Sequence, residues 1–473
     1  MKLLLPRIIT ATFTLSFLLT TCVMAQTATT GTIEGGITDI HGAIVPRVTI
    51  TVTSPNLIRA QSVTSDNEGR YRIVNLPPGR YAVIVEATAG FARFVQPNVT
   101  VNLSRTSILA IQLEVAGATA TVTVNNISSP VDTTDNTTGT NVSTEQFLNF
   151  TTQRTVQSLY TIAPTVSRSG LRDPSGRDRD PSVAGSSGLE NSYIFDGVNT
   201  TDPSFGGSGA NLPFEFVQEV EIKTGAYAAE YGLSTGGIFN VLTKSGGNDF
   251  HGDAFAYFTT KGLVRETKHF PFTGSAPNGF SEIDAGFDLG GPLKKDKLWF
   301  FGALNPQRRA NSFLTQTLRQ KASNKVTTPF YAGKLTYALS KWNTLTFSTF
   351  GDFTRITGFR VGVAGAGGTV LSGFAADPNS FMSETELGGN NYILRLNSTI
   401  TPKWIGEFAF GAHFQRNNII PAASVAQTEL VTDNFAILRN GMVLPVSDSN
   451  VDFGDVTGFL AFVDGRGGSL ERG

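Results

Sequence analysis

From His251 onward the sequence repeats short segments in which large apolar residues alternate with small or polar ones. The clearest segments are residues 253–258, 283–289 and 331–337. Because successive side chains of a strand point to opposite faces, this alternation gives each strand one apolar and one polar face. We therefore expect residues 248–473 to form a transmembrane antiparallel β-barrel, with apolar faces toward lipid and polar faces toward the lumen.

A soluble β-sandwich can show the same alternation, but the aromatic residues and turns favour a barrel. The chain holds 35 Phe, many of them near the expected strand ends, where barrels carry aromatic girdles. Short turns are expected at residues 291–296 and 401–403, and a longer outward loop at residues 377–389. No segment beyond the N-terminal stretch offers 18 uninterrupted apolar residues, so any membrane span must be a barrel.

The N-terminal stretch has the layout of a secretion signal. Lys2 and Arg7 precede an apolar run over residues 8–19, which is too short for a transmembrane helix. Small residues follow at a suitable cleavage position, so we expect residues 1–25 to be removed and the mature chain to begin at Gln26. The protein is thus expected to be exported.

The only cysteine, Cys22, lies inside this signal and is expected to leave with it. A lipoprotein signal is the weaker alternative, because Thr21 stands where that motif has Gly, Ala or Ser. The mature chain is then expected to carry neither a disulfide nor thiol chemistry.

Residues 26–115 carry short β-rich runs separated by turn residues. Asp66 and Gly69 bound one predicted turn, and residues 77–79 form another. Asp66 and Glu68 suggest calcium, but such a site needs six or more oxygens, so a turn is the favoured interpretation. The β-rich runs are residues 32–37, 48–52, 71–74, 81–87 and 108–113.

Residues 66–71 and 76–81 resemble the carboxypeptidase regulatory-like domain. The resemblance implies a transthyretin-like β-sandwich over residues 26–115, which in that family is an accessory domain without catalytic activity despite its name. A Thr-, Val- and Asn-rich linker follows over residues 116–141.

Residues 142–247 mix helical and strand signals. Short helices are expected from Glu145 and over residues 154–162. Residues 193–199 read as a strand, an Asp-Gly turn and a second strand, and residues 217–223 as a half-buried strand. This segment is therefore expected to be an α+β domain.

The run 217–246 resembles the closing half of the plug domain of TonB-dependent receptors, and residues 290–301 resemble the barrel opening of their Oar-like branch. The fold class implied is mainly β: a transthyretin-like sandwich, an α+β plug domain, then a partial transmembrane barrel. In such receptors, the segment that contacts TonB lies between sandwich and plug. The matching positions here are Thr119, Thr121, Val122 and Val124, although an ordinary connecting strand is an equal alternative.

The resemblance implies an outer-membrane receptor that binds a small-molecule, glycan or peptide ligand and takes it up with energy from a TonB-type partner. The plug residues expected to face the ligand are Tyr193, Phe195, Asp196 and Asn199. The alternative is a surface carbohydrate-binding or adhesion protein that a β-barrel anchors in the membrane lipid.

Other function classes lack sequence support. The formal net charge of −1 gives no footprint for nucleic acid. His41, His251, His269 and His413 are far apart, with no zinc-binding spacing, and no GxSxG motif occurs. The Gly pairs are not followed by the Lys-Ser/Thr of a phosphate loop. We expect no catalytic site, no cofactor and no metal.

The length of the barrel segment sets a further expectation. A barrel that encloses a plug needs about 22 strands. The 223 residues from His251 onward supply about 11 strands at about 20 residues each. The sequence is therefore expected to be truncated within the barrel.

Overall fold

The structure is a computed structural model of the 473-residue chain. The signal peptide expected over residues 1–25, and with it Cys22 and the cleavage site before Gln26, lies outside the described residues. The structure describes residues 29–87, 90–115, 121–123, 136–147, 154–169, 180–202, 206–228, 231–232, 234–263, 276–314, 321–359, 382–401, 404–421, 428–431, 435–438 and 443–445.

Residues 29–115 form a β-sandwich, referred to below as the sandwich. Its two sheets enclose an apolar core that includes Ile33, Ile50 and Val83. One sheet contains β1 (Gly31–Asp39), β4 (Arg70–Leu76), β7 (Thr106–Ile108) and β8 (Ile111–Leu113). The other has the order β3 (Gln61–Thr64), β2 (Thr49–Thr53), β5 (Gly79–Val85), β6 (Arg93–Val101) and β9 (Thr121–Thr123).

The turn between β3 and β4 forms where the sequence places it. Asp66 Oδ1 accepts hydrogen bonds from the backbone N–H groups of Glu68 and Arg70, and Gly69 has a φ of +70°. Only glycine adopts this left-handed conformation without strain, so Asp66 caps the turn that Gly69 completes. The sandwich expected from the sequence is confirmed.

The plug, residues 138–247, is built on a five-stranded sheet. Its strand order is β10 (Thr138–Ser143), β15 (Val217–Gly225), β16 (Ile238–Thr243), β13 (Ser192–Phe195) and β14 (Val198–Asn199). The sheet thus begins at Thr138, inside the stretch expected to be linker. Smaller elements are α2 (Thr144–Phe147), α3 (Val156–Tyr160), β11 (Val166–Ser167), β12 (Ser182–Val183), η1 (Gly188–Glu190) and η2 (Phe214–Phe216).

Stacked aromatic rings form the centre of the plug. Tyr160 of α3 stacks on Phe239 of β16 at 4.2 Å between ring centroids, and Phe239 stacks on Tyr193 of β13 at 5.3 Å. Asp196 and Gly197 both have positive φ and join β13 to β14 as a two-residue hairpin turn. The Asp-Gly turn is the one that the sequence predicts, and it reverses the chain at the edge of the plug sheet.

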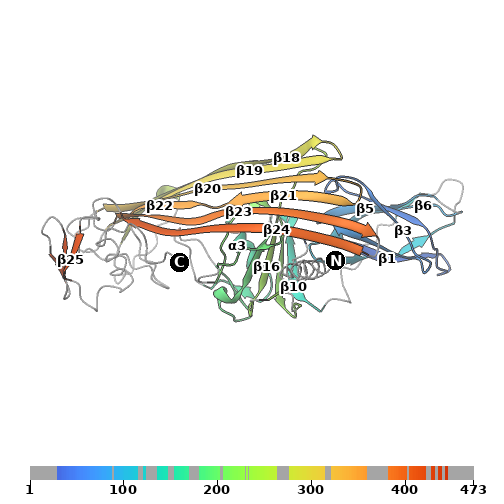
Figure 1. Cartoon of the computed structure of the whole chain (residues 1–473), viewed down its shortest axis with the longest axis horizontal. Helices are drawn as coiled ribbons and strands as arrows, with labels where there is room; N and C mark the ends of the chain where they lie inside the picture. Colours follow the sequence, from blue (N-terminus) through green and yellow to red (C-terminus); the bar gives the residue numbers. More distant parts are fainter. Residues whose placement is uncertain are drawn as a thin grey trace, which may run out of the picture.

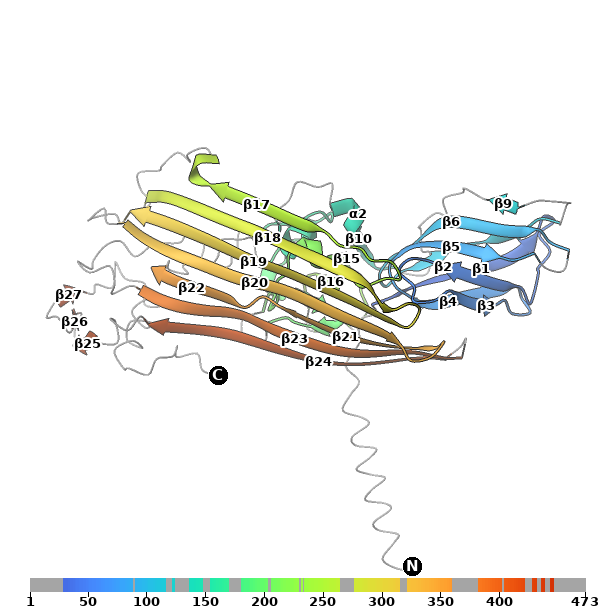
Figure 2. The same cartoon turned by 90° about the horizontal axis from the view of Figure 1, so that it is seen from above.

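Long antiparallel strands form a curved wall, which arches over the plug and has the sandwich at one end (Figures 1 and 2). We call this eight-stranded sheet the barrel wall. Its strands are β17 (Ala254–Thr260), β18 (Ala276–Lys294), β19 (Leu298–Leu314), β20 (Lys321–Ala338), β21 (Asn343–Gly351), β22 (Thr354–Phe359), β23 (Met382–Thr401) and β24 (Trp404–Pro421). A short helix η3 (Lys261–Leu263) and a three-stranded sheet of β25 (Thr428–Val431), β26 (Phe435–Leu438) and β27 (Val443–Pro445) complete the described elements.

One loop prediction is wrong from residue 382 onward. Residues 377–381 of the expected outward loop lie outside the described residues. Residues 382–389 belong to β23, where residues 383–387 pair with both β22 and β24. Cross-strand hydrogen bonds on both sides override the polar composition of this stretch. Among the described residues, no helix has the length and apolarity needed to cross a membrane.

The two faces of the barrel wall differ as the alternation predicts. Phe408 and Phe410 of β24 are about 60% exposed, at 59% and 63%, on the outer face. Phe347 of β21 and Leu394 of β23, which face each other across the pairing, also point outward. Polar side chains of the inner face, such as Asn305 and Ser348, are buried on the side of the wall that faces the plug. The outer face therefore suits lipid, and the inner face requires polar partners.

We predict that Phe347→Arg prevents assembly, whereas Thr346→Arg is tolerated. Phe347 lies on the outer face, where Arg near the bilayer midplane costs about 2–4 kcal/mol. Thr346 is its neighbour on the opposite face and lines a cavity on the inner side of the wall. The measurement is the fraction of each variant recovered folded in the outer membrane, and equal recovery of the two would contradict the assignment of the faces.

Candidate functional site: the plug–barrel interface

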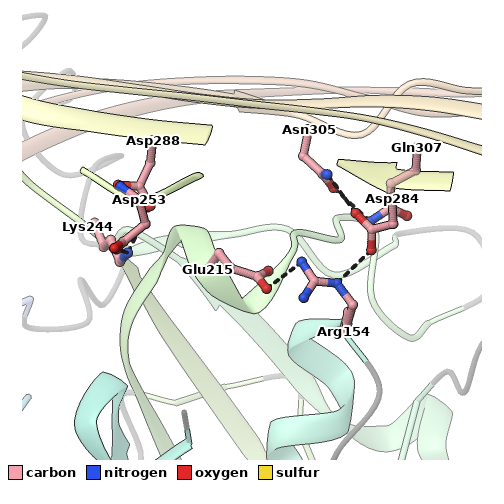
Figure 3. Close-up of polar contacts among 8 residues, drawn as sticks. All are labelled: Arg154, Glu215, Lys244, Asp253, Asp284, Asp288, Asn305 and Gln307. Atoms are coloured by element: carbon pink, nitrogen blue, oxygen red, sulfur yellow. Dashed lines mark hydrogen bonds and ion pairs between the residues drawn. The ribbon is translucent and has the colours of Figure 1, made fainter. Parts of the chain in front are cut away.

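Two plug cations reach two carboxylates of one wall strand (Figure 3). Arg154 Nε lies 2.7 Å from Asp284 Oδ2, and Lys244 Nζ lies 2.9 Å from Asp288 Oδ2. Asp284 and Asp288 are four residues apart on β18, so both point to its inner face. These ion pairs join the plug to the wall at two levels along the same strand.

Arg154 lies between the plug and the wall strand β17. It forms an ion pair with Glu215 of η2, and its guanidinium carbon lies 3.5 Å from the ring centroid of Tyr257 and 4.8 Å from that of Phe255. Burial raises the pKa of Glu215 to about 7, although the neighbouring Arg154 acts in the opposite direction. With Phe214, whose ring centroid lies 5.4 Å away, the Arg154 guanidinium contacts two buried carboxylates and three aromatic rings.

A relay of amide groups fixes the wall side of this contact. Asn305 Nδ2 donates to Asp284 Oδ1 at 2.7 Å, and Gln307 Nε2 donates to Asn305 Oδ1 at 2.7 Å (Figure 3). Lys244 has a second, longer contact of 3.6 Å with Asp253. Hydrogen bonds on both sides of a buried carboxylate orient it and satisfy its oxygens. The wall therefore presents Asp284 in a fixed position.

Asp196 is the third point of attachment. Its carboxylate accepts hydrogen bonds from Thr243 Oγ1 at 2.7 Å and from Thr243 N at 2.9 Å, and it lies 3.2 Å from Lys334 Nζ of β20. Arg395 of β23 donates to the backbone carbonyl of Asp196 at 3.0 Å. The hairpin turn of the plug is thus held by two cations of the wall.

The plug also contacts the sandwich through a buried carboxylate. Glu219 Oε1 accepts hydrogen bonds from Leu103 N at 2.8 Å and from Asn141 Nδ2 at 2.7 Å. Burial raises the pKa of Glu219 to about 7, and the two hydrogen bonds oppose this effect. An exposed ion pair between Arg80 and Glu145 joins the same two domains at the surface.

The four residues predicted to face a ligand occupy different environments. Tyr193 and Phe195 are fully buried in the plug core, and Asp196 faces the wall cations as described above. Asn199 at the end of β14 is exposed. The structure therefore does not bring the four side chains together on one surface, and the ligand-facing role stays a prediction.

The predicted TonB-contact segment is described in part. Thr121 and Val122 belong to β9, which pairs in parallel with β6 at the edge of the sandwich. Thr119 and Val124 lie outside the described residues. Contact of this segment with a partner also stays a prediction.

Sequence reasoning missed the residues that join plug and wall, among them Arg154, Lys244 and Lys334. A usable signal exists only for the wall. Asp284 and Asp288 interrupt an apolar alternation at positions of equal parity, which marks charges on the inner face. Their plug partners carry no comparable local pattern. Among the described residues, no group of three or more His, Cys, Asp or Glu side chains is placed to hold a metal ion.

Three domain families match the chain, in the same order along the sequence as the sandwich, the plug and the barrel wall. Residues 32–114 match the carboxypeptidase regulatory-like domain, residues 130–238 the TonB-dependent receptor plug domain, and residues 242–320 an outer membrane beta barrel domain. The chain therefore has the domain organisation of TonB-dependent receptors, and it is located in the outer membrane.

The chain is similar to two curated proteins over part of their length. It is 31% identical over 402 residues to the TonB-dependent transporter Oar of Myxococcus xanthus, covering 76% of this chain and 36% of that protein. It is also 31% identical over 112 residues to the ferrienterobactin receptor of Escherichia coli K12, covering 22% of this chain and 14% of the receptor. The chain thus spans about a third of the length of the first relative.

Among solved structures, the outer membrane transporter YddB of Escherichia coli is similar with a TM-score of 0.49 and 15% identity. The similarity covers 60% of this chain and 40% of that one.

We predict that Arg154→Ala lowers the free energy of unfolding by about 3–5 kcal/mol, because it leaves Glu215 and Asp284 buried at the plug–wall interface without their cation. The measurement is the denaturant midpoint of the purified protein in detergent. The control is Arg80→Ala, whose ion pair with Glu145 is exposed and is expected to contribute no more than about 1 kcal/mol. Equal effects of the two substitutions would refute a special role for Arg154.

We predict that contact between sandwich and plug weakens as the pH rises through about 7, the pKa of buried Glu219. The pKa of Glu219 is raised from its ordinary 4.5, so the carboxyl contributes its full stabilisation of the folded state below pH 4.5. That contribution is lost as the pH rises through about 7. Glu219→Gln keeps an acceptor for Leu103 N–H and removes the titration. Amide exchange at Leu103 should therefore accelerate between pH 5 and pH 8, after correction for the intrinsic pH dependence, in the unmodified protein only.

Proposed function

We propose that the protein is an outer-membrane receptor that takes up a bound ligand when an energy-coupling protein of the TonB type moves its plug. The observation that carries the proposal is the plug seated on the inner face of the wall through Arg154, Lys244 and Asp196. In a closed barrel, a plug in this position fills the lumen, so passage of a solute requires its displacement or rearrangement. No bond chemistry enters this cycle.

The described contacts support movement of the plug under force. Apolar residues of plug and wall share one core, yet the contacts of Arg154 and Lys244 with β18 are ion pairs. Polar groups that separate can be rehydrated, whereas a fully apolar interface would lose its burial energy without compensation. The side of the plug that faces β18 is therefore the one that we expect to separate first.

The position of β10 supports a pull from the N-terminal side. β10 is the edge strand of the plug sheet and pairs only with β15 among the described strands. It is the next described strand after β9, which contains Thr121 and Val122. Force applied to that segment reaches β10 first and can separate it from β15 one hydrogen bond at a time. We propose that the energy-coupling partner binds at or near residues 119–124.

We propose a small-molecule, glycan or peptide ligand that binds on the side of the plug where Asn199 is exposed. One relative is named as a transporter without a stated ligand, and the other is named as a receptor for ferrienterobactin. A carbohydrate-binding adhesion protein anchored by the barrel is not favoured, since an anchor has no use for a plug that fills the lumen.

We predict that a cysteine at position 245 is labelled by a maleimide faster in cells that contain the energy-coupling protein than in cells that lack it. Ser245 Oγ lies 3.5 Å from Thr336 Oγ1 at the junction of plug and wall, and Cys22, the only native cysteine, lies in the expected signal. The measurement is labelling of Ser245→Cys in cells with and without the coupling protein, at least severalfold higher in the former.

The matched control is Thr51→Cys, which lies within the sandwich and should label equally in both strains. Equal labelling of Ser245→Cys in both strains would contradict energy-driven movement of the plug and return the anchor hypothesis to favour.

A further inference from the structure

A cavity of about 860 Å³ lies where the sandwich, the plug and the barrel wall meet. We call it the chamber. The sandwich contributes residues on both sides of Arg59 and the corner around Asn75, the plug contributes Asp196 and Gln218, and the wall contributes β20, β21 and β23. Its volume lies within the range of about 300–1,000 Å³ typical of sites for small ligands.

The chamber exists because the sandwich is docked at the end of the wall. Arg59 Nε donates to the carbonyl of Asp296 in the turn between β18 and β19 at 3.1 Å. Asn75 Nδ2 donates to Thr399 Oγ1 of β23 at 3.2 Å. The third attachment is the buried contact of Glu219 with Leu103. These contacts hold the sandwich to two separate strand regions of the wall and to the plug, with the chamber among them.

The charged residues that line the chamber are unbalanced. The cations are Arg59, Arg72, Lys334, Lys341 and Arg395, whereas Asp196 is the lining carboxylate among the described residues. Carboxylates paired with these cations from outside the lining add two more, since Arg72 lies 3.4 Å from Glu34 and Arg395 pairs with Glu407. Five cations against three carboxylates leave an excess of two positive charges.

The cations are arranged in depth. Lys334 and Arg395 are buried on the wall beside Asp196, and they form the inner end of the chamber. Arg59 on the sandwich and Lys341 on the turn between β20 and β21 lie at its outer part, where they are half-buried and exposed. A negatively charged solute is therefore attracted from the rim and meets further cations within.

Neutral hydrogen-bond donors cover much of the wall between these charges. Hydroxyl and amide groups can satisfy the remaining oxygens of a carboxylate or phosphate that a cation holds. The donors on the wall are Thr336, Thr344, Thr346, Ser348 and Asn397.

We propose that the chamber is a binding site for an anionic solute, one that carries carboxylate or phosphate groups, and that the docked sandwich completes it. The proposal rests on the proposed function in one respect, the direction in which the solute moves. In that direction the solute passes the plug first and then occupies the chamber. Equilibrium binding to the chamber requires no energy coupling, so it can be tested separately.

The test uses the purified chain in detergent and three peptide or sugar probes: triglutamate, trilysine and maltotriose. We expect triglutamate to bind in isothermal titration calorimetry, with an affinity that falls as salt is added, and the other two probes to bind at least tenfold more weakly. The double variant Arg72→Gln/Lys341→Gln should weaken triglutamate binding at least tenfold. Both side chains line the chamber and are exposed, and neither is among the contacts that hold the sandwich to the wall, so the fold should tolerate their loss.

The matched control is Arg47→Gln/Lys325→Gln, which removes one Arg from the sandwich and one Lys from the wall at exposed positions outside the chamber. It should bind triglutamate as the unmodified chain does. The proposal is overturned if triglutamate does not bind, if maltotriose binds equally well, or if the two double variants have the same effect. Binding that depends on Arg72 and Lys341 in a protein without energy-driven plug movement would sustain the chamber and refute the transport cycle.

Discussion

The barrel wall must satisfy two different surroundings with a single alternating strand pattern. Its outer face carries exposed Phe and Leu side chains, and its inner face carries Asp284, Asp288 and Lys334. Buried charges of this kind are costly without partners. The plug supplies them as Arg154, Lys244 and Asp196, so the polarity of the inner face determines where the plug can sit. The same contacts have to separate if the plug moves.

The sandwich, at the end of the wall strands, is also held mainly by polar contacts. The domain has its own core and shares with the plug and wall mainly polar contacts, through Glu219, Arg59 and Asn75. These polar contacts surround a cavity, the chamber, at the junction of the three parts. The cations that line that space come from both the sandwich and the wall. The accessory domain therefore adds more to the site than a tether, because it provides part of the lining.

Local sequence patterns predicted the elements that depend on local physics. The turn at Asp66 and Gly69 and the hairpin at Asp196 and Gly197 formed as predicted, since each needs only a short-range hydrogen bond and positive φ values. Residues 382–389 did not follow their composition, because pairing with two neighbouring strands outweighed it. Tyr193 and Phe195, selected as ligand-facing residues, lie in the plug core, since their strand β13 is buried on both faces.

The sequence by itself determined the order of the three domains, the β-class of the chain and the two faces of the wall strands, because periodicity and turn chemistry act within a few residues. Only the tertiary structure decided which charges meet. Arg154 and Asp284 are 130 positions apart, Lys334 and Asp196 are 138 apart, and Arg395 and Asp196 are 199 apart. Pairings over such separations depend on how the plug seats against the wall, and no local pattern specifies that arrangement.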